Sequence, residues 1–186
     1  MASSASRLRT RANALTGLRL VAGPLLVLAL LRDQPVAAFA LFWLAVASDL
    51  LDGRVARRYG EVSPLGGFLD HVTDAAFVSM GLAALAVRGE APMWLPLAVG
   101  LAFLQYSLDS RVLGPPGQAA LVASALGRWN GIAYFVPIGT VVVRDALGLG
   151  WPPDGLVLAM GWALVLSTVL SMADRAAAFM RARRPS

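Results

Sequence analysis

The sequence predicts an all-α integral membrane protein, in which a bundle of six transmembrane helices follows a short N-terminal juxtamembrane segment. Hydrophobic residues make up 58% of the 186 positions and charged residues only 15%, a balance typical of membrane proteins rather than soluble domains. Apolar stretches long enough to cross a bilayer recur along the chain, separated by short polar or Gly/Pro-rich turns. The absence of cysteine excludes disulfides, thiolate metal sites and cysteine nucleophiles.

We expect one compact membrane domain, residues 12–180, between a polar basic N-terminal segment, 1–11, and a basic C-terminal tail, 181–186. The N-terminal segment is too polar to form the apolar core of a signal peptide. The stretch 118–147 is too long for one straight span, so its first third is expected at the cytoplasmic interface. The six spans are expected at 15–31, 36–59, 65–87, 92–113, within 118–147, and at 155–173.

Turn residues mark the boundaries between these spans. The polar stretch 32–35 separates the first two. Gly60 is expected to cap the second span, while Ser63 and Pro64 suit the start of the third. Further turns are expected at 88–90, 114–117 and 144–154.

The arginines predict the orientation in the membrane, since all sixteen basic residues are arginine. With both termini in the cytoplasm, eleven arginines lie on that side and three outside, as the positive-inside rule requires. We therefore expect a multi-pass protein of the cell inner (cytoplasmic) membrane, with its active site cytoplasmic and in contact with anionic lipids rather than nucleic acid. The cytoplasmic set is Arg7, Arg9, Arg11, Arg54, Arg57, Arg58, Arg111, Arg175, Arg181, Arg183 and Arg184, and the outer set is Arg32, Arg88 and Arg144.

Four aspartates lie in or at the edge of two apolar segments. Asp49 and Asp52 are three residues apart, and Asp70 and Asp74 are four apart, so each pair shares one face of its helix. A carboxylate at membrane depth costs roughly 2.5–3.5 kcal/mol, so arginines, water or cations must compensate these four. If the second and third spans pack antiparallel across the short connection, both pairs face one crevice. Such an oxygen cage suits Mg²⁺, Mn²⁺ or Ca²⁺, and two ions bridging phosphate oxygens fit four carboxylates.

Small residues and an arginine are interleaved with these aspartates. Gly53 and Ala56 leave one side of the second span without bulk, and Gly66 does the same for the third. Arg57 is placed to contact phosphate. The alternative is that the small residues serve close helix packing.

Together these residues form the pattern D-x2-D-G-x2-A-R-x8-G-x3-D-x3-D, which resembles the signature of the CDP-alcohol phosphatidyltransferase family at all eight fixed positions. The pattern covers 26 of the 186 residues. The resemblance implies a six-helix membrane domain, a homodimer, and an enzyme of phospholipid biosynthesis. That enzyme transfers a phosphatidyl or similar phospho group from a CDP-linked lipid donor to an alcohol and releases CMP.

The resemblance also implies roles for the individual residues. Asp74 is the expected base on the acceptor hydroxyl. The metal ligands, for Mg²⁺ or Mn²⁺ and two ions, are Asp49, Asp52, Asp70 and Asp74. The CDP-binding residues are Asp52, Gly53, Ala56, Arg57 and Gly66.

The acceptor alcohol is less clearly defined by the sequence. Arg111 and Arg128, near the cytoplasmic ends of neighbouring spans, suit a phosphorylated alcohol such as glycerol 3-phosphate or inositol phosphate. Contact with lipid headgroups is the alternative for both. Residues 126–128 resemble the LGK of glycerophosphate-using members, but residues 129–131 replace the lysine and threonine that usually follow.

Two other functions remain open. Residues 68–71 resemble the choline and ethanolamine phosphotransferases, which act on a lipid alcohol. A non-catalytic divalent-cation-binding membrane protein or transporter is a further alternative. It is disfavoured because the second half of the chain carries no acidic counterpart of the motif.

Three other polar features lie in the apolar segments. The stretch 13–19 resembles the N-x-L-T-x-x-R that opens this family's domain; otherwise it is a helix N-cap with a snorkelling arginine. His71, the only histidine, is expected to be a hydrogen-bonded wall residue rather than a base. Asp109 is expected to form a structural ion pair.

Overall fold

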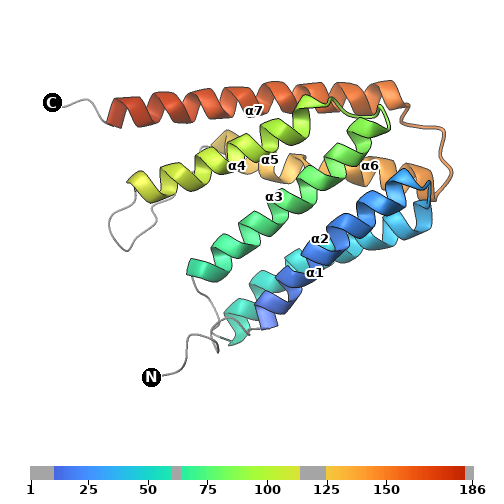
Figure 1. Cartoon of the computed structure of the whole chain (residues 1–186), viewed down its shortest axis with the longest axis horizontal. Helices are drawn as coiled ribbons and strands as arrows, with labels where there is room; N and C mark the ends of the chain where they lie inside the picture. Colours follow the sequence, from blue (N-terminus) through green and yellow to red (C-terminus); the bar gives the residue numbers. More distant parts are fainter. Residues whose placement is uncertain (1–10, 60–63, 114–124, 183–186) are drawn as a thin grey trace.

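The computed structural model describes residues 11–59, 64–113 and 125–182, and every regular element among them is a helix (Figure 1). Side chains are described within 17–51, 67–108 and 126–180. The predicted all-α class is confirmed. The helices are α1 (Arg11–Leu31), α2 (Pro35–Tyr59), α3 (Pro64–Val87), α4 (Trp94–Leu113), α5 (Ala125–Ala133), α6 (Phe135–Ala146) and α7 (Asp154–Ala182).

The predicted fifth segment is divided into α5 and α6 at Tyr134. Pro137 gives the reason, because it has no N–H to donate to the carbonyl of Ala133 and its ring crowds that carbonyl. The final helix runs to Ala182, beyond the expected end at 173, and the expected turn at 144–145 belongs instead to the last turn of α6. The predicted caps at Gly60 and Ser63 and the turn at 114–117 lie outside the described residues.

Two described helical stretches are long and apolar enough to cross a membrane by length and composition, namely Gly67–Val87 and Asp154–Met180. Three shorter apolar stretches, Gly17–Leu31, Pro35–Leu51 and Trp94–Leu108, accompany them. The exposed surface of these helices is also apolar in places. On α4 a row of half-exposed leucines recurs at helical spacing, an apolar stripe typical of a face covered by lipid. The row is Leu97, Leu101, Leu104 and Leu108.

Helix α1 is the centre of the first half of the bundle, because it packs against both α2 and α3. Within the described parts of the chain, α2 and α3 do not pack directly on each other. The predicted crevice was conditional on antiparallel packing of these two helices, and between their described parts that packing is replaced by the packing of α1 on both. The second half continues through α4 on α3, α7 on α4, α5 on α7, and α6 against α2, α3 and α7 (Figure 1).

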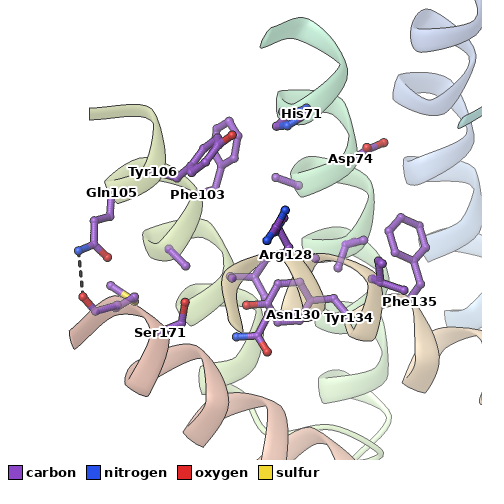
Figure 2. Close-up of a pocket in the computed structure, with 18 of the residues that line it drawn as sticks. His71, Asp74, Phe103, Gln105, Tyr106, Arg128, Asn130, Tyr134, Phe135 and Ser171 are labelled. Atoms are coloured by element: carbon purple, nitrogen blue, oxygen red, sulfur yellow. Dashed lines mark hydrogen bonds between the residues drawn. The ribbon is translucent and has the colours of Figure 1, made fainter. Parts of the chain in front are cut away.

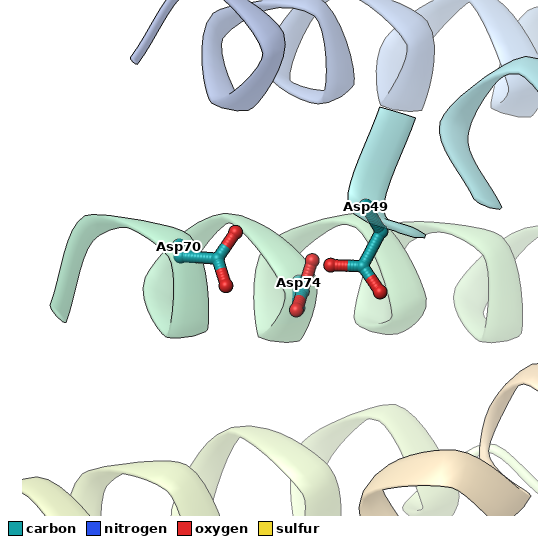
Figure 3. Close-up of side chains that lie close together, drawn as sticks. All are labelled: Asp49, Asp70 and Asp74. Carbon is teal, nitrogen blue, oxygen red and sulfur yellow. The ribbon is translucent and has the colours of Figure 1, made fainter. Parts of the chain in front are cut away.

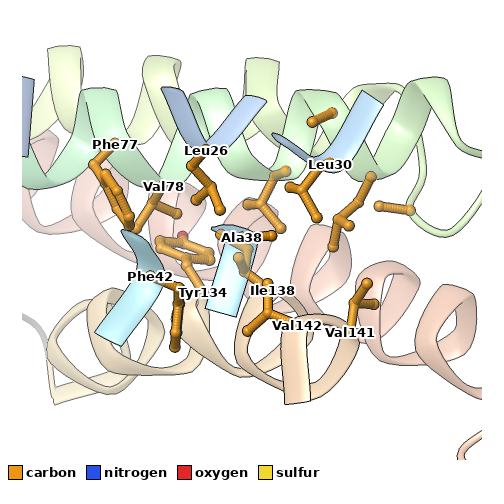
Figure 4. Packing of buried hydrophobic residues seen from close by; sticks show 14 of the residues in the cluster. Leu26, Leu30, Ala38, Phe42, Phe77, Val78, Tyr134, Ile138, Val141 and Val142 are labelled. Atoms are coloured by element: carbon orange, nitrogen blue, oxygen red, sulfur yellow. The ribbon is translucent and has the colours of Figure 1, made fainter. Parts of the chain in front are cut away.

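The apolar core lies where α1, α2, α3 and α6 meet (Figure 4). Leu26, Phe42, Phe77 and Ile138 are each at most 3% exposed. A Cβ added to Gly81 would lie 2.7 Å from Cδ1 of Ile138, so glycine permits the close approach of α3 and α6. This core positions the site and is apolar except for the hydroxyl of Tyr134, a residue that also lines the cavity of the site.

Three helix ends close in the same way at one end of the bundle. The residues with positive φ are Asp33 at 50°, Gly89 at 78° and Gly148 at 62°. At each, the next backbone N–H donates to a carbonyl five residues earlier, as at Glu90, whose nitrogen lies 2.8 Å from the oxygen of Leu85. The three connections lie together at the end of the bundle away from the start of α1 (Figure 1).

A buried ion-pair cluster ties these connections together. Nη2 of Arg144 lies 3.2 Å from Oε1 of Glu90, and its Nη1 lies 2.6 Å from Oδ1 of Asp154. Nη2 of Arg88 lies 2.8 Å from Oδ2 of Asp145 and 3.0 Å from the same Glu90 oxygen. Burial raises the pKa of Glu90, and the guanidinium groups of Arg88 and Arg144 oppose that rise. The cluster joins the end of α3 to the α6–α7 connection.

Replacing Arg144 by methionine should destabilise the fold by about 3–5 kcal/mol, because Glu90 would remain buried with one cation fewer. Thermal unfolding in detergent measures this loss. Asp154→Asn is the matched control, since that carboxylate is 67% exposed and its pair should contribute at most about 1 kcal/mol. Equal melting temperatures for the parent and Arg144→Met would contradict a stabilising cluster.

Candidate active site

Three of the four motif aspartates converge in the structure. Asp49 comes from α2, and Asp70 and Asp74 come from successive turns of α3 (Figure 3). One carboxylate oxygen from each lies within 4.8 Å of the others. The side chains are 39%, 30% and 29% exposed, so the cluster is shielded but reachable. Three hard oxygen donors at this spacing fit a divalent cation such as Mg²⁺ or Mn²⁺.

Arg19 of α1 enters this cluster and is only 1% exposed. Its Nη1 lies 2.7 Å from Oδ1 of Asp49, and its guanidinium also donates to the carboxylates of Asp70 and Asp74. One guanidinium can balance one of the three charges. With all three carboxylates ionised, the described cluster keeps a net charge of −2, the charge that one divalent cation would neutralise.

Helix α1, which packs on both α2 and α3, thus supplies the positive charge that the carboxylates of those two helices need. From sequence, Arg19 was either part of a family-like opening or a snorkelling arginine. Its burial excludes snorkelling. Its exact partners could not be predicted, because they lie 30 to 55 residues away along the chain.

A cavity of about 780 Å³ opens beside the cluster and reaches across to α4, α5 and α7 (Figure 2). Asp49 and Asp74 line one side of it. Arg128 of α5 and Arg175 of α7 line it as well. The described walls therefore carry carboxylates from α2 and α3 and cations from α5 and α7, separated by a largely apolar lining.

An aromatic group supports the cationic side. The rings of His71 and Tyr106 are stacked, with centroids 6.0 Å apart and an interplanar angle of 19°. The guanidinium of Arg175 lies 4.7 Å from the centroid of the Tyr106 ring, a cation–π distance. His71 lies in the cavity wall, the position expected from the sequence, and its ring is stacked on that of Tyr106.

Only some of the predicted site residues have side chains that the structure describes. Asp49, Asp70 and Asp74 cluster, and Arg128 lines the cavity. The remaining predicted side chains lie outside the described ones, although their backbones are helical. They are Asp52, Gly53, Ala56 and Arg57 in α2, Gly66 in α3 and Arg111 in α4, with Asp109 also on α4.

The sequence analysis assigned no role in the site to two residues that line the cavity, Arg175 and Asn130. Arg175 appeared only as one of the cytoplasmic arginines, and Asn130 only as a departure from a family pattern. A signal for Arg175 was present, since Ser167, Ser171 and Arg175 recur every four residues and so share a face of one helix. No sequence signal showed that this face meets Asn130.

A second, apolar groove of about 550 Å³ runs between α2 and α6. Val46, Ile132 and Phe135 line both this groove and the cavity, so the two are adjacent. Trp43 and Val136, both about half exposed, lie along the groove at the outer surface. An apolar groove therefore lies between the cavity and the surroundings of the bundle.

Carboxylates arranged for a divalent cation, beside a cavity lined with arginines, define a site for phosphorylated substrates. Comparison with known proteins specifies the class. The family model for CDP-alcohol phosphatidyltransferase matches residues 9–173. The chain belongs to this family and is a transferase of that class.

Individual relatives agree with the family. A probable phosphatidylglycerophosphate synthase of Mycobacterium tuberculosis is 29% identical, covering 95% of this chain and 84% of the relative. A cardiolipin synthase (CMP-forming) of Streptomyces coelicolor is 31% identical, covering 84% of this chain and 74% of the relative. An archaetidylinositol phosphate synthase of Aeropyrum pernix is 39% identical over 50% of this chain and 48% of the relative.

Replacing Arg19 by glutamine should lower the melting temperature in chelator, because three half-buried carboxylates would lose their described cation. Mg²⁺ should then raise the melting temperature of the variant more than that of the parent, since more uncompensated charge awaits the ion. Arg32→Gln, an exposed arginine at the other end of α1, is the matched control. Equal Mg²⁺-induced shifts in parent and Arg19→Gln would show that the guanidinium and the ion do not share these carboxylates.

Proposed function

We propose that this transferase moves a phosphatidyl group from CDP-diacylglycerol to a phosphorylated alcohol, with glycerol 3-phosphate the first candidate and inositol phosphate the second. The observation that carries the proposal is the convergence of Asp49, Asp70 and Asp74 beside a cavity that also holds two arginines. The names of the relatives support it, since they include phosphatidylglycerophosphate and archaetidylinositol phosphate synthases.

Asp49, Asp52, Asp70 and Asp74 would hold two divalent ions, Mg²⁺ or Mn²⁺. When bound, these ions supply neutralisation of the diphosphate charge. The three described carboxylates and the charge of −2 that Arg19 leaves fit one ion, and Asp52 with the diphosphate of the donor would provide for the second. Beside them, Gly53, Ala56, Arg57 and Gly66 would receive the CDP group, Arg57 by pairing with phosphate.

Asp74 is the proposed base. It takes the proton from the acceptor hydroxyl as that oxygen bonds to the phosphorus carrying the diacylglycerol. The bond from that phosphorus to the CMP oxygen breaks, and CMP leaves with the bonding electrons. The described residues offer no serine–base pair for a covalent intermediate, which favours direct attack.

Arg128 and Arg175 would meet the phosphate of the acceptor, with Arg111 as a further candidate. Two cations in the cavity wall favour an anionic acceptor over the uncharged lipid alcohol of the choline and ethanolamine alternative, which would give them no anion to bind. The choline and ethanolamine alternative is therefore the weaker one. Family membership leaves the transporter alternative without support.

The groove between α2 and α6 would hold an acyl chain of the donor. From Phe135 to Arg144 the rise of α6 is about 14 Å, close to the roughly 15 Å depth of one leaflet of the hydrocarbon core. Because the groove lies next to the cavity, the diphosphate of the same lipid would lie near the aspartates.

The proposed membrane arrangement has six spans, formed by α1, α2, α3, α4, α5 with α6, and α7. The α5–α6 unit, Ala125–Ala146, is about 33 Å long, which is enough to cross a bilayer. The location of Arg88 and Arg144 at the end away from the aspartates supports a cytoplasmic active site in the inner membrane. A homodimer in contact with anionic lipids completes the proposal.

The deciding experiment measures CMP release by the purified protein from CDP-diacylglycerol with Mn²⁺ or Mg²⁺ and a panel of alcohols. EDTA should abolish turnover and lower the melting temperature, and added Mg²⁺ or Mn²⁺ should restore both, because the carboxylates lose and regain their countercharge. The panel consists of glycerol 3-phosphate, inositol phosphate, inositol, serine and choline. Full turnover in excess EDTA would refute the metal-dependent mechanism.

Asp74→Asn should reduce kcat by at least about 100-fold while nucleotide binding persists, since the amide cannot accept the hydroxyl proton. Asp52→Asn should instead weaken Mn²⁺ and CDP binding together. Binding is measured by thermal stabilisation with CDP and Mn²⁺. A near-normal rate for Asp74→Asn would assign the base elsewhere.

A further inference from the structure

Asn130 is a buried amide in the wall of the cavity, only 4% exposed. Its Oδ1 accepts a hydrogen bond from Oγ of Ser167 at 2.6 Å, which fixes the side chain against α7. Among the described residues, its Nδ2 is buried and has no hydrogen-bond partner. A buried donor without a partner is costly, so a ligand oxygen is the natural complement.

Gln105 of α4 has a matching arrangement. Its Nε2 donates to the carbonyl oxygen of Met172 on α7 at 3.0 Å (Figure 2). Its Oε1 is buried without a partner among the described groups, and Gln105 lines the same cavity. Two amides, each fixed at one end to α7, thus have one spare donor and one spare acceptor.

One face of α7 carries polar side chains on the same side as the amides and the arginines. Ser167, Ser171 and Arg175 share that face over about 12 Å, and the latter two line the cavity. A ligand whose phosphate lies at Arg128 and Arg175 and whose reacting hydroxyl reaches Asp74 would have a further hydroxyl free to meet one of the amides. A hydroxyl group can both donate and accept, so it can complement either the spare Nδ2 or the spare Oε1.

Resting on the proposed function, we propose that Asn130 and Gln105 recognise a non-reacting hydroxyl group of the acceptor, so that the enzyme selects phosphorylated polyols over phosphorylated mono-alcohols. The arginines bind the phosphate that both classes share. The amides distinguish them, because a site built to hydrogen-bond a hydroxyl rejects the analogue that lacks it.

The test compares glycerol 3-phosphate with 3-hydroxypropyl phosphate, which lacks only the middle hydroxyl, at saturating CDP-diacylglycerol. The parent should prefer glycerol 3-phosphate in kcat/KM. In Asn130→Leu, KM for glycerol 3-phosphate should rise about 2- to 12-fold, and the preference should fall by the same factor. Gln105→Met should act in the same direction, and KM for the donor should not change.

Two controls separate recognition from structure. Arg128→Ala should raise KM for both acceptors by about ten- to a hundredfold and leave the preference intact, because both carry the phosphate. Ser107→Ala removes another buried hydroxyl that is unpartnered among the described groups and does not line the cavity, so it should change neither KM nor preference.

The outcomes distinguish the two proposals. A parent that releases no CMP with either acceptor or with inositol phosphate would overturn the proposed function, and the hydroxyl recognition with it. An active parent whose preference survives in both Asn130→Leu and Gln105→Met would overturn the hydroxyl recognition alone. A preference lost in these variants and retained in Arg128→Ala and Ser107→Ala supports it.

Discussion

The interaction on which the rest of the structure depends is that of Arg19 with three carboxylates. Asp49 belongs to α2 and Asp70 and Asp74 to α3, two helices whose described parts do not pack on each other. Buried carboxylates without a partner would repel one another and force these helices apart. Because α1 packs on both helices and carries the buried guanidinium, it can hold the two parts of the site together. The same contact leaves the three ionised carboxylates with a net charge of −2, so the ion pairs that join the helices also leave the charge that the proposed cation would neutralise.

The two ends of the bundle show different uses of buried charge. At the end away from the aspartates, Arg88 and Arg144 pair with three acidic side chains and tie three helix ends together. At the other end one arginine faces three carboxylates beside an open cavity. Close pairing of charges rigidifies a connection, whereas an unbalanced cluster retains affinity for a ligand. The apolar core between them contains the residues that hold both ends in position.

Sequence patterns could predict the helices and the faces of single helices, since these depend on local spacing. The convergence of Asp70 with Asp74 follows from a separation of four residues, and the break at Tyr134 follows from Pro137. The position of α1 between α2 and α3 could not be derived in this way, because spacing does not determine which helices become neighbours. The partners of Arg19 and of Asn130 were missed for the same reason, as they come from distant segments. The amides gave no pattern, because one polar residue in an apolar helix has many possible roles.

The charge distribution of the cavity also orients the acceptor proposed above. A phosphate dianion is repelled by the carboxylates of Asp49 and Asp74 and attracted by Arg128 and Arg175. Within a lining that is largely apolar these interactions are less screened than in water, so the phosphate end is drawn toward α5 and α7. The hydroxyl end is then directed toward α3, where Asp74 lies. The arginines would therefore contribute to the proposed reaction as well as to affinity, since they would keep the wrong end of the acceptor away from Asp74.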